Sequence, residues 1–250
     1  MNQQIFEEQE IPLSQMESIG LGKNGRLNLK EEDLRALLSG GRTGMLRLTD
    51  LESGDIKIEA MDAKLSLKRN ENGMLDLMVH PIYKTPLAPG YLTDDEVLAL
   101  EGGELPNLDK SYVDDKGTFR EVLVEFDKET NEFVVTAAER ITAPEFVNSQ
   151  KLTAEQKERY RKGKEVELQD GTKIQFSGTA PEGIRSNRLA LVASILVDGG
   201  LSYMAYHALK ALFGQKHDEE VAKVHSAGYE QALKDMQQSR QRAAAFTNSR

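Results

Sequence analysis

The sequence contains no cysteine among its 250 residues. This absence excludes a disulfide framework, thiol catalysis, and any zinc or iron–sulfur site built on Cys ligands. The patterns G-x-S-x-G, H-E-x-x-H and G-x-x-x-x-G-K-[ST] are also missing, so no familiar hydrolase, metalloprotease or nucleotide-binding motif is present. The sequence therefore favours a protein that is not an enzyme.

Residues able to hold a metal or to act as acid and base are also few and poorly spaced. The four histidines are His80, His207, His217 and His225. His217 and His225 lie eight positions apart, whereas two ligands side by side on a helix would lie three or four apart. Pairs of acids such as Asp94-Asp95 are adjacent, so their side chains diverge. We therefore expect no catalytic residue, no metal and no cofactor.

Charge is divided unevenly along the chain, whose formal net charge is −9. Residues 1–150 hold 16 Lys and Arg against 29 Asp and Glu, which gives −13, and residues 151–250 hold 16 against 12, which gives +4. An acidic body is a poor general binder of nucleic acid, because phosphate contacts need Lys and Arg. The first ten residues include acids and no base, the reverse of a secretory signal, so we expect a cytoplasmic protein.

Short capped helices recur at intervals of about 60 residues. Thr93 with Glu96, and Thr153 with Gln156, have the spacing of a capping box. A looser copy begins near Lys30 without a Thr cap. These patterns predict helices that start near residues 30, 93 and 153. Strand-like alternation follows each helix, at 45–48, 55–60, 63–67 and 74–79, at 119–126 and 132–136, and at 165–168 and 172–176.

The predicted fold is α+β, built from repeated units of a short capped helix plus a small antiparallel sheet, with a helical C-terminal region. The Pro-rich stretch 81–90 and the stretch 142–150 separate the units. The expected organisation is a disordered N-terminus at 1–10, an N-terminal α+β unit at 11–80, a second repeat unit at 91–141, a third, partial unit at 151–180, an apolar helical pair at 187–214 and a C-terminal helix at 218–242.

Two sets of segments carry a resemblance to known families. The segments 11–13, 19–21, 37–43 and 63–67 resemble one uncharacterised domain, and 91–93, 124–133 and 151–156 resemble a second, which commonly occurs in tandem. Both resemble domains of proteins encoded on conjugative transposons of Bacteroidetes. Neither domain has assigned catalytic residues. The resemblance implies an accessory protein of a mobile element.

Two short segments could contact phosphate. Gly40, Gly41, Arg42 and Thr43 could form an anion nest, although phosphate loops usually lead into a helix and this one follows a helix; a C-cap and turn is the favoured interpretation. A basic cluster could contact nucleic acid, with its tyrosine stacking on a base. It consists of Lys157, Arg159, Tyr160, Arg161, Lys162 and Lys164. Four nearby glutamates dilute it, and a solvated helix face is favoured.

The most apolar stretch, 189–213, is long enough to cross a bilayer. Asp198 lies near its centre and would cost roughly 2.5–3.5 kcal/mol on membrane insertion, which favours two short helices over a membrane hairpin. We expect self-association or a protein partner through residues 189–236. The candidate contacts are Leu201, Met204, Ala205, Leu209, Leu212, Val221, Val224 and Met236.

The favoured function is a non-enzymatic interaction or scaffold protein of a conjugative element. The alternative is a nucleic-acid-binding accessory protein that acts through the basic C-terminal part, and membrane association is the weaker alternative for 189–213. Salt distinguishes the first two, because binding to nucleic acid weakens steeply as salt rises.

Overall fold

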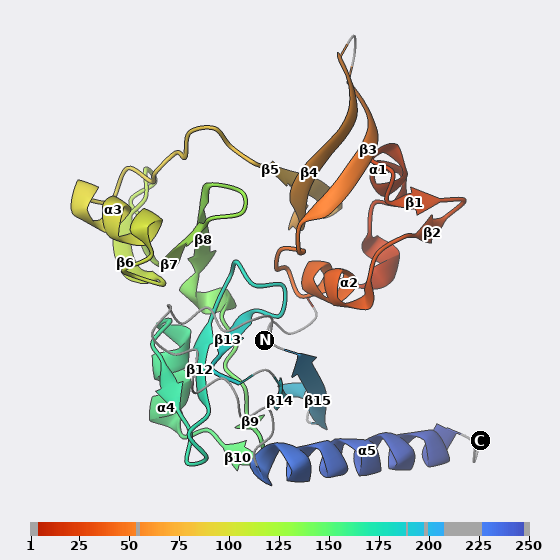
Figure 1. Ribbon diagram of the computed structural model, residues 1–250, viewed down its shortest axis with the longest axis vertical. Helices are drawn as coiled ribbons and strands as arrows, with labels where there is room; N and C mark the ends of the chain where they lie inside the picture. Colours follow the sequence, from red (N-terminus) through yellow and green to blue (C-terminus); the bar gives the residue numbers. More distant parts are fainter. Residues whose placement is uncertain (1–4, 54–55, 189, 198–199, 208–226, 248–250) are drawn as a thin grey trace. The chain divides into compact units, whose positions relative to one another are not determined.

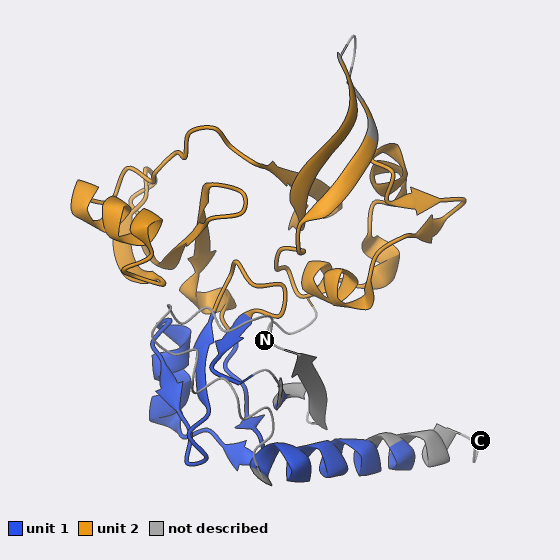
Figure 2. Ribbon diagram, in the orientation of Figure 1, with its two compact units in different colours: residues 1, 142–176, 184–250 blue, residues 2–141, 177–183 orange. Residues whose placement is uncertain are grey.

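The protein combines helices with several small antiparallel sheets, an α+β fold, in a computed structural model (Figure 1). The structure describes residues 5–53, 56–188, 190–197, 200–207 and 227–247. Two compact units divide the chain (Figure 2). We call Asn2–Ile141 with Ser177–Gly183 the N-terminal unit, and Thr142–Phe176 with Ile184–Arg250 the C-terminal unit.

The N-terminal unit begins with small elements that pack around Met16, which is fully buried. They are η1 (Glu8–Glu10), α1 (Leu13–Ser18), β1 (Gly22–Lys23), β2 (Arg26–Leu27) and α2 (Glu31–Leu38). Phe6 is buried in the same core, and Arg69 lies over its ring. The expectation of a disordered segment at 1–10 is therefore wrong for residues 5–10, because an aromatic side chain buried near the chain start holds this segment in place.

The first sheet has the order β3-β4-β5, with β3 at Leu46–Ser53, β4 at Ile56–Arg69 and β5 at Leu75–Pro81. The strands predicted at 55–60 and 63–67 are one continuous strand, β4. Asp62, between them, pairs in register with Arg47 of β3, and their side chains form an ion pair at 3.1 Å. This cross-strand charge pair lets the ladder run through the polar position.

The second sheet follows α3 (Asp94–Gly102) and has the order β6-β7-β8. Its strands are β6 (Leu108–Val113), β7 (Phe119–Asp127) and β8 (Glu132–Ala137), and η2 (Ala138–Arg140) follows them. The structure confirms Thr93 as an N-cap with a complete capping box, and α3 ends at Gly103 in the left-handed conformation. Sequence patterning missed β6, whose alternation around Asp109 and Lys110 is weak.

The C-terminal unit contains β9 (Phe146–Val147), β10 (Gln150–Lys151), α4 (Ala154–Arg161), β11 (Val166–Glu167), β12 (Lys173–Phe176) and β13 (Ile184–Ser186). Thr153 is confirmed as the N-cap of α4, again with a complete capping box. The predicted tight hairpin at Asp170-Gly171 joins β11 to β12, and Gly171 has the positive φ of 74° that the turn needs.

Asn148 joins three parts of this unit. It follows β9 and has a positive φ, as does Ser149, in a two-residue turn to β10. Its backbone N–H donates to the Val192 carbonyl at 2.8 Å, and its Oδ1 accepts from the Val192 N–H at 3.0 Å. Its Nδ2 donates to Thr172 Oγ1 at 3.2 Å and to Asp170 Oδ2 at 3.4 Å. The buried amide is therefore satisfied at both its nitrogen and its oxygen.

The apolar helical pair expected at 187–214 is wrong for residues 190–197 and 200–207, and residues 208–214 lie outside the described part of the chain. The first two stretches form β14 (Ala190–Val197) and β15 (Gly200–His207), in a sheet of order β10-β9-β14-β15. An apolar run of eight residues fits a buried strand as well as a helix, and the β-branched residues Val192, Ile195 and Val197 favour the strand. Asp198, where we expected two helices to divide, lies outside the described residues.

The final helix, α5, spans Ala227–Thr247, so it extends beyond the predicted end at 242. Its predicted beginning at 218 lies outside the described residues. Tyr229, Ala232 and Met236 of α5 form a small core with Val192 of β14. Within the part of the chain that the structure describes, no helix is long and apolar enough to cross a membrane.

Candidate functional site

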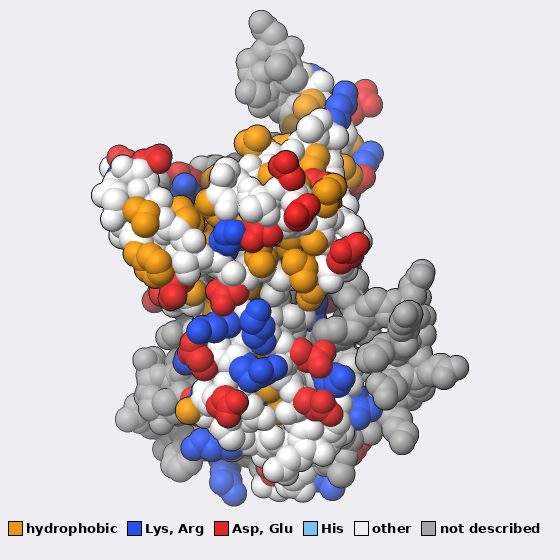
Figure 3. Space-filling model, turned by 90° about the vertical axis from the view of Figure 1, so that its left-hand side faces the viewer, with side chains coloured by type: hydrophobic (Ala, Val, Ile, Leu, Met, Phe, Trp, Pro, Cys, Tyr) orange, Lys and Arg blue, Asp and Glu red, His pale blue; other side chains and the backbone are white. Residues whose placement is uncertain are grey.

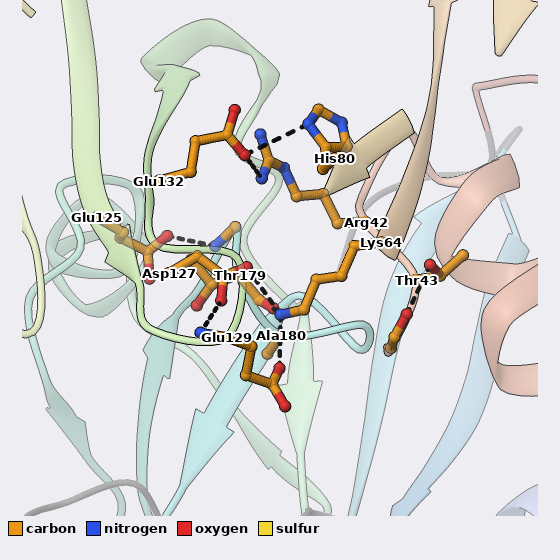
Figure 4. Close-up of polar contacts among 12 residues, drawn as sticks. Arg42, Thr43, Lys64, His80, Glu125, Asp127, Glu129, Glu132, Thr179 and Ala180 are labelled. Atoms are coloured by element: carbon orange, nitrogen blue, oxygen red, sulfur yellow. Dashed lines mark hydrogen bonds and ion pairs between the residues drawn. The ribbon is translucent and has the colours of Figure 1, made fainter. Parts of the chain in front are cut away.

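The N-terminal unit buries a lysine against carboxylates. The lysine comes from the first sheet, and the carboxylates come from the β7–β8 hairpin. Lys64 of β4 is 2% exposed. Its Nζ lies 2.7 Å from Asp127 Oδ2 and 2.7 Å from Glu129 Oε2 (Figure 4). Asp127 is also buried, so this ion pair is shielded from water. The attraction between the two charges offsets the cost of removing them from water only while both partners are in place.

The hairpin loop that carries these carboxylates is held in shape by local hydrogen bonds. Asp127, the last residue of β7, accepts from the Glu129 N–H at 3.1 Å through Oδ1, as Asp commonly does in turns. Asn131 has a positive φ of 55° and donates from Nδ2 to the Tyr83 carbonyl at 2.8 Å. One Asp127 oxygen therefore shapes the loop while the other faces Lys64.

A second ionic contact lies at the start of β8. Arg42 Nη1 is 2.6 Å from Glu132 Oε2, and His80 Nδ1 is 3.4 Å from the same oxygen (Figure 4). Burial raises the pKa of Glu132, but hydrogen bonds from His80 and Arg42 and the charge of Arg42 outweigh it and lower the pKa to about 2. Glu132 is therefore charged throughout the neutral and mildly acidic range.

Glu125 of β7 is fully buried and binds the loop that connects β12 and β13. Ser177 Oγ donates to its Oε1 at 2.9 Å, and the Gly178 N–H donates to its Oε2. Lys64 Nζ also lies 3.4 Å from the Thr179 carbonyl oxygen. The loop at residues 177–183 thus completes the polar interior of the N-terminal unit, although it comes from a later part of the sequence.

One family model matches the chain, at residues 6–89. The matched family is described as Protein of unknown function (DUF4099). Residues 6–89 are thus similar to this family, and we refer to them as the DUF4099 domain. Neither curated proteins nor solved structures show a significant match.

In both ionic contacts the basic residues lie within the DUF4099 domain and the acidic residues lie beyond its end. The basic members, Arg42, Lys64 and His80, lie inside the domain, and the acidic members, Asp127, Glu129 and Glu132, come from the β7–β8 hairpin beyond it. We call these six residues the docking cluster. Opposite charges placed in this way fix register and exclude wrong partners. The DUF4099 domain therefore receives an acidic hairpin from the next part of the chain.

Ser66, beside the docking cluster, extends it into a chain of contacts in the order serine, histidine, carboxylate. Ser66 Oγ is 2.8 Å from His80 Nε2, whose Nδ1 faces Glu132. In a nucleophilic relay the carboxylate stabilises the imidazolium that forms, but here Arg42 already pairs with Glu132. Ser66 also lies within β4, opposite Met78 of β5 in a regular ladder. These contacts tie β4, β5 and β8 together.

The weaker interpretation of Gly40, Gly41, Arg42 and Thr43, an anion nest, is wrong. The N–H groups of Gly40 and Gly41 donate to the Leu37 and Ala36 carbonyls, which is the C-terminal cap of α2. The Thr43 N–H donates to Leu65 in β4, and Arg42 is paired with Glu132. These groups therefore close a helix and join a strand, as the favoured interpretation held.

The tyrosine of the basic cluster at 157–164 is not available for stacking on a base. Tyr160 is fully buried, with its ring edge-on to Phe176 at 6.2 Å between centroids, so the proposed base stacking is wrong. Lys157 pairs with Glu145, and Arg161 and Lys162 each lie 3.7 Å from Glu158. Arg159 donates to the Glu165 carbonyl, and Lys164 is exposed. On the face of the molecule that Figure 3 draws, Lys and Arg side chains are interspersed with Asp and Glu side chains.

The candidate interface residues fall into three groups. Met236 is buried against Val192 inside the C-terminal unit, so its assignment to an interface is wrong. Leu201, Met204 and Ala205 lie on β15, not on a helix face. The remaining residues, Leu209, Leu212, Val221 and Val224, lie outside the described part of the chain.

The docking cluster was missed at the sequence level, although two signals point to it. Lys64 stands directly between the apolar residues Ala63 and Leu65 in β4, a strand that also carries charges at Asp62 and Lys68. The β7–β8 loop gathers acids within six residues, at Asp127, Glu129 and Glu132. A buried charge needs a partner of opposite sign, and this acidic loop supplies it.

Proposed function

We propose that the chain is a non-enzymatic interaction scaffold of a conjugative mobile element. The observation that carries the proposal is the docking cluster, in which charged groups are buried between segments far apart in sequence. Lys64 and Asp127 are separated by 63 residues and are both almost completely buried. Side chains paired in this way organise modules relative to one another, which is what a scaffold needs.

The modular part of the proposal is supported by a recurring order of elements. A helix is followed by three antiparallel strands in sequence order at α2 with β3–β5, at α3 with β6–β8 and at α4 with β11–β13. The last two helices share the same capping box at Thr93 and Thr153. Val124-Glu125-Phe126-Asp127 in β7 also matches Ile174-Gln175-Phe176-Ser177 at β12 in its pattern of apolar and polar residues. We interpret these parallels as tandem modules.

The setting in a mobile element rests on the resemblance of the sequence segments. The DUF4099 match at residues 6–89 is consistent with the first of the two resembling domains, but it carries no function of its own. Cytoplasmic residence and a protein partner are part of the same proposal.

Nucleic-acid binding through the C-terminal part is the second candidate. The net charge of +4 over residues 151–250 favours it. Burial of Tyr160 and the pairing of Lys157 with Glu145 weaken it, because both remove groups that would meet bases or phosphates.

Affinity capture with the full chain tests the proposal. The bait would be exposed to lysate from a host carrying the element, with and without nuclease, at about 50 mM and about 200 mM salt. A scaffold retains the same protein partner under all four conditions. If capture is abolished by nuclease and falls steeply between the two salt concentrations, by roughly 10³–10⁵ for six to ten phosphate contacts, the nucleic-acid alternative replaces the scaffold.

A further inference from the structure

The C-terminal unit has an unusual sheet edge at β15. This strand ends the order β10-β9-β14-β15, and within the described residues it pairs only with β14, through a continuous register from Gly200 to His207. The outer side of an edge strand presents unpaired backbone N–H and C=O groups to any strand that can align with it. An eight-residue edge is long enough to form a substantial ladder with a further strand.

The sequence of β15 lacks the features that protect edge strands. Such strands usually carry charged residues or proline, which prevent pairing with other chains. Each of the nine other edge strands that the structure describes contains at least one charged residue: Lys23, Arg26, Arg47, Asp76, Asp109, Glu132, Lys151, Glu167 and Arg185, one per strand. β15 contains no Lys, Arg, Asp, Glu or Pro. It shares this property with β9 and β14, the two interior strands of its own sheet.

We infer that β15 pairs antiparallel with β15 of a second copy of this chain, which makes it an interior strand of a sheet shared by two protomers. A two-fold axis brings identical strands together in antiparallel order, and each side meets its own sequence. With the axis at Tyr203 or at Met204, that residue lies in register with the same residue of the second copy, and the backbone ladder extends to both sides of it. No charged residue of the strand meets a like charge.

The occupant is a second copy, and not an unrelated strand, because the edge is self-complementary and neutral throughout. A partner recognised by its charge would need opposite charges on β15, and β15 contains no Lys, Arg, Asp or Glu. This inference rests on the proposed scaffold role and names one of its partners. Its test is separate from that of the docking cluster, because β15 belongs to the C-terminal unit and the docking cluster to the N-terminal unit.

Sedimentation of the full chain tests the pairing. We expect a species of twice the chain mass of 27.9 kDa, which dissociates on dilution. Met204→Lys and Tyr206→Glu, which each add a charge to the edge strand, should each weaken the dimer at least about tenfold. Phe119→Lys is the matched control, because Phe119 is an exposed apolar strand residue of the N-terminal unit, and it should leave the dimer unchanged.

Cysteine cross-linking gives a second measurement that does not depend on disrupting the strand. The chain has no cysteine, so any disulfide formed by a single-cysteine variant joins two copies. Tyr203→Cys, Met204→Cys and a mixture of the two would be oxidised, since a disulfide needs Cα atoms within about 7 Å. At least one of the three samples should form covalent dimers and Phe119→Cys should not. A wild-type chain that stays monomeric at about 100 µM, or a dimer unaffected by both β15 variants and not cross-linked at 203 or 204, overturns the inference.

Discussion

The two units each bury a polar side chain where distant segments of sequence meet, but they use different chemistry. In the N-terminal unit, Lys64 meets Asp127 and Glu129 as a charge. In the C-terminal unit, Asn148 meets Val192, Thr172 and Asp170 through its backbone and its amide. Both side chains are almost fully buried, so burial alone does not explain why one unit uses a charged group and the other a neutral amide.

The difference lies in what happens when one partner is removed. A buried charge that loses its counter-charge retains its full cost of leaving water, whereas a neutral amide that loses a partner costs only an unmade hydrogen bond. The N-terminal unit should therefore be more sensitive to single substitutions and to pH, and the C-terminal unit should respond more weakly.

The largest expected effect is at Lys64. Lys64→Met leaves Asp127 buried without a counter-charge, so we expect the free energy of unfolding to fall by about 3–5 kcal/mol. Urea denaturation of the full chain, followed by tyrosine fluorescence or circular dichroism, measures this change.

The matched control replaces both charges. Lys64→Met combined with Asp127→Leu removes the ion pair without leaving a buried charge, so the double variant should regain most of the lost stability. If the single variant costs less than about 1 kcal/mol, as an exposed pair would, the pair contributes little and the comparison between the units fails.

A smaller effect is expected at Asn148. Asn148→Ala leaves the Val192 N–H and the Thr172 hydroxyl without this partner, which should lower stability by about 1–3 kcal/mol. Ser149→Gly is the control, because it alters the same turn without removing a hydrogen bond, and glycine accepts the positive φ of 65° at this position. A loss at Asn148 as large as that at Lys64 would remove the distinction between charge and amide.

The smallest effect is the pH dependence carried by Glu132. Its pKa is lowered from 4.5 to about 2, so its contribution to stability is present above pH 4.5 and is lost as the pH falls toward 2. The carboxylate is partly exposed, so solvent screening reduces the effect to about 1–2 kcal/mol. Burial raises the pKa of Asp33 and of Glu182, so the contributions of these two groups are instead lost as the pH rises through their raised values.

Glu132→Gln isolates this contribution. The variant should be less stable than the wild type at pH 5, and the difference should shrink by pH 2.5, where the wild-type carboxylate begins to bind a proton. A stability difference between the two proteins that stays constant with pH would show that His80 and Arg42 do not hold Glu132 as a charged group.

Local patterns in the sequence predicted local structure well. The capping boxes at Thr93 and Thr153 depend on residues three positions apart, and both are present. The hairpin at 127–131 was likewise predicted from its polar loop between alternating strands. In each case the deciding interactions lie within a few residues of one another, where sequence spacing determines them directly.

Non-local features could not be predicted in this way. The apolar runs of β14 and β15 are too short for periodicity to separate strand from helix. The pairing of β14 with both β9 and β15 decides the outcome. Tyr160 appeared to belong to a basic surface because its neighbours in sequence are charged, yet its position on α4 turns it toward Phe176. The pairing of Lys64 with Asp127 spans 63 residues, and no local rule selects that partner.

The route of the chain through residues 177–183 has a consequence for the order of synthesis. Glu125 leaves the ribosome 52 residues before Ser177, the hydroxyl donor that it binds. At about 5–20 residues per second, this interval lasts roughly 3–10 seconds. During that time the Glu125 carboxylate lacks its hydrogen-bond donors, because Ser177 and Gly178 have not yet been synthesised. The N-terminal unit therefore cannot finish folding first, although nearly all of it is translated first.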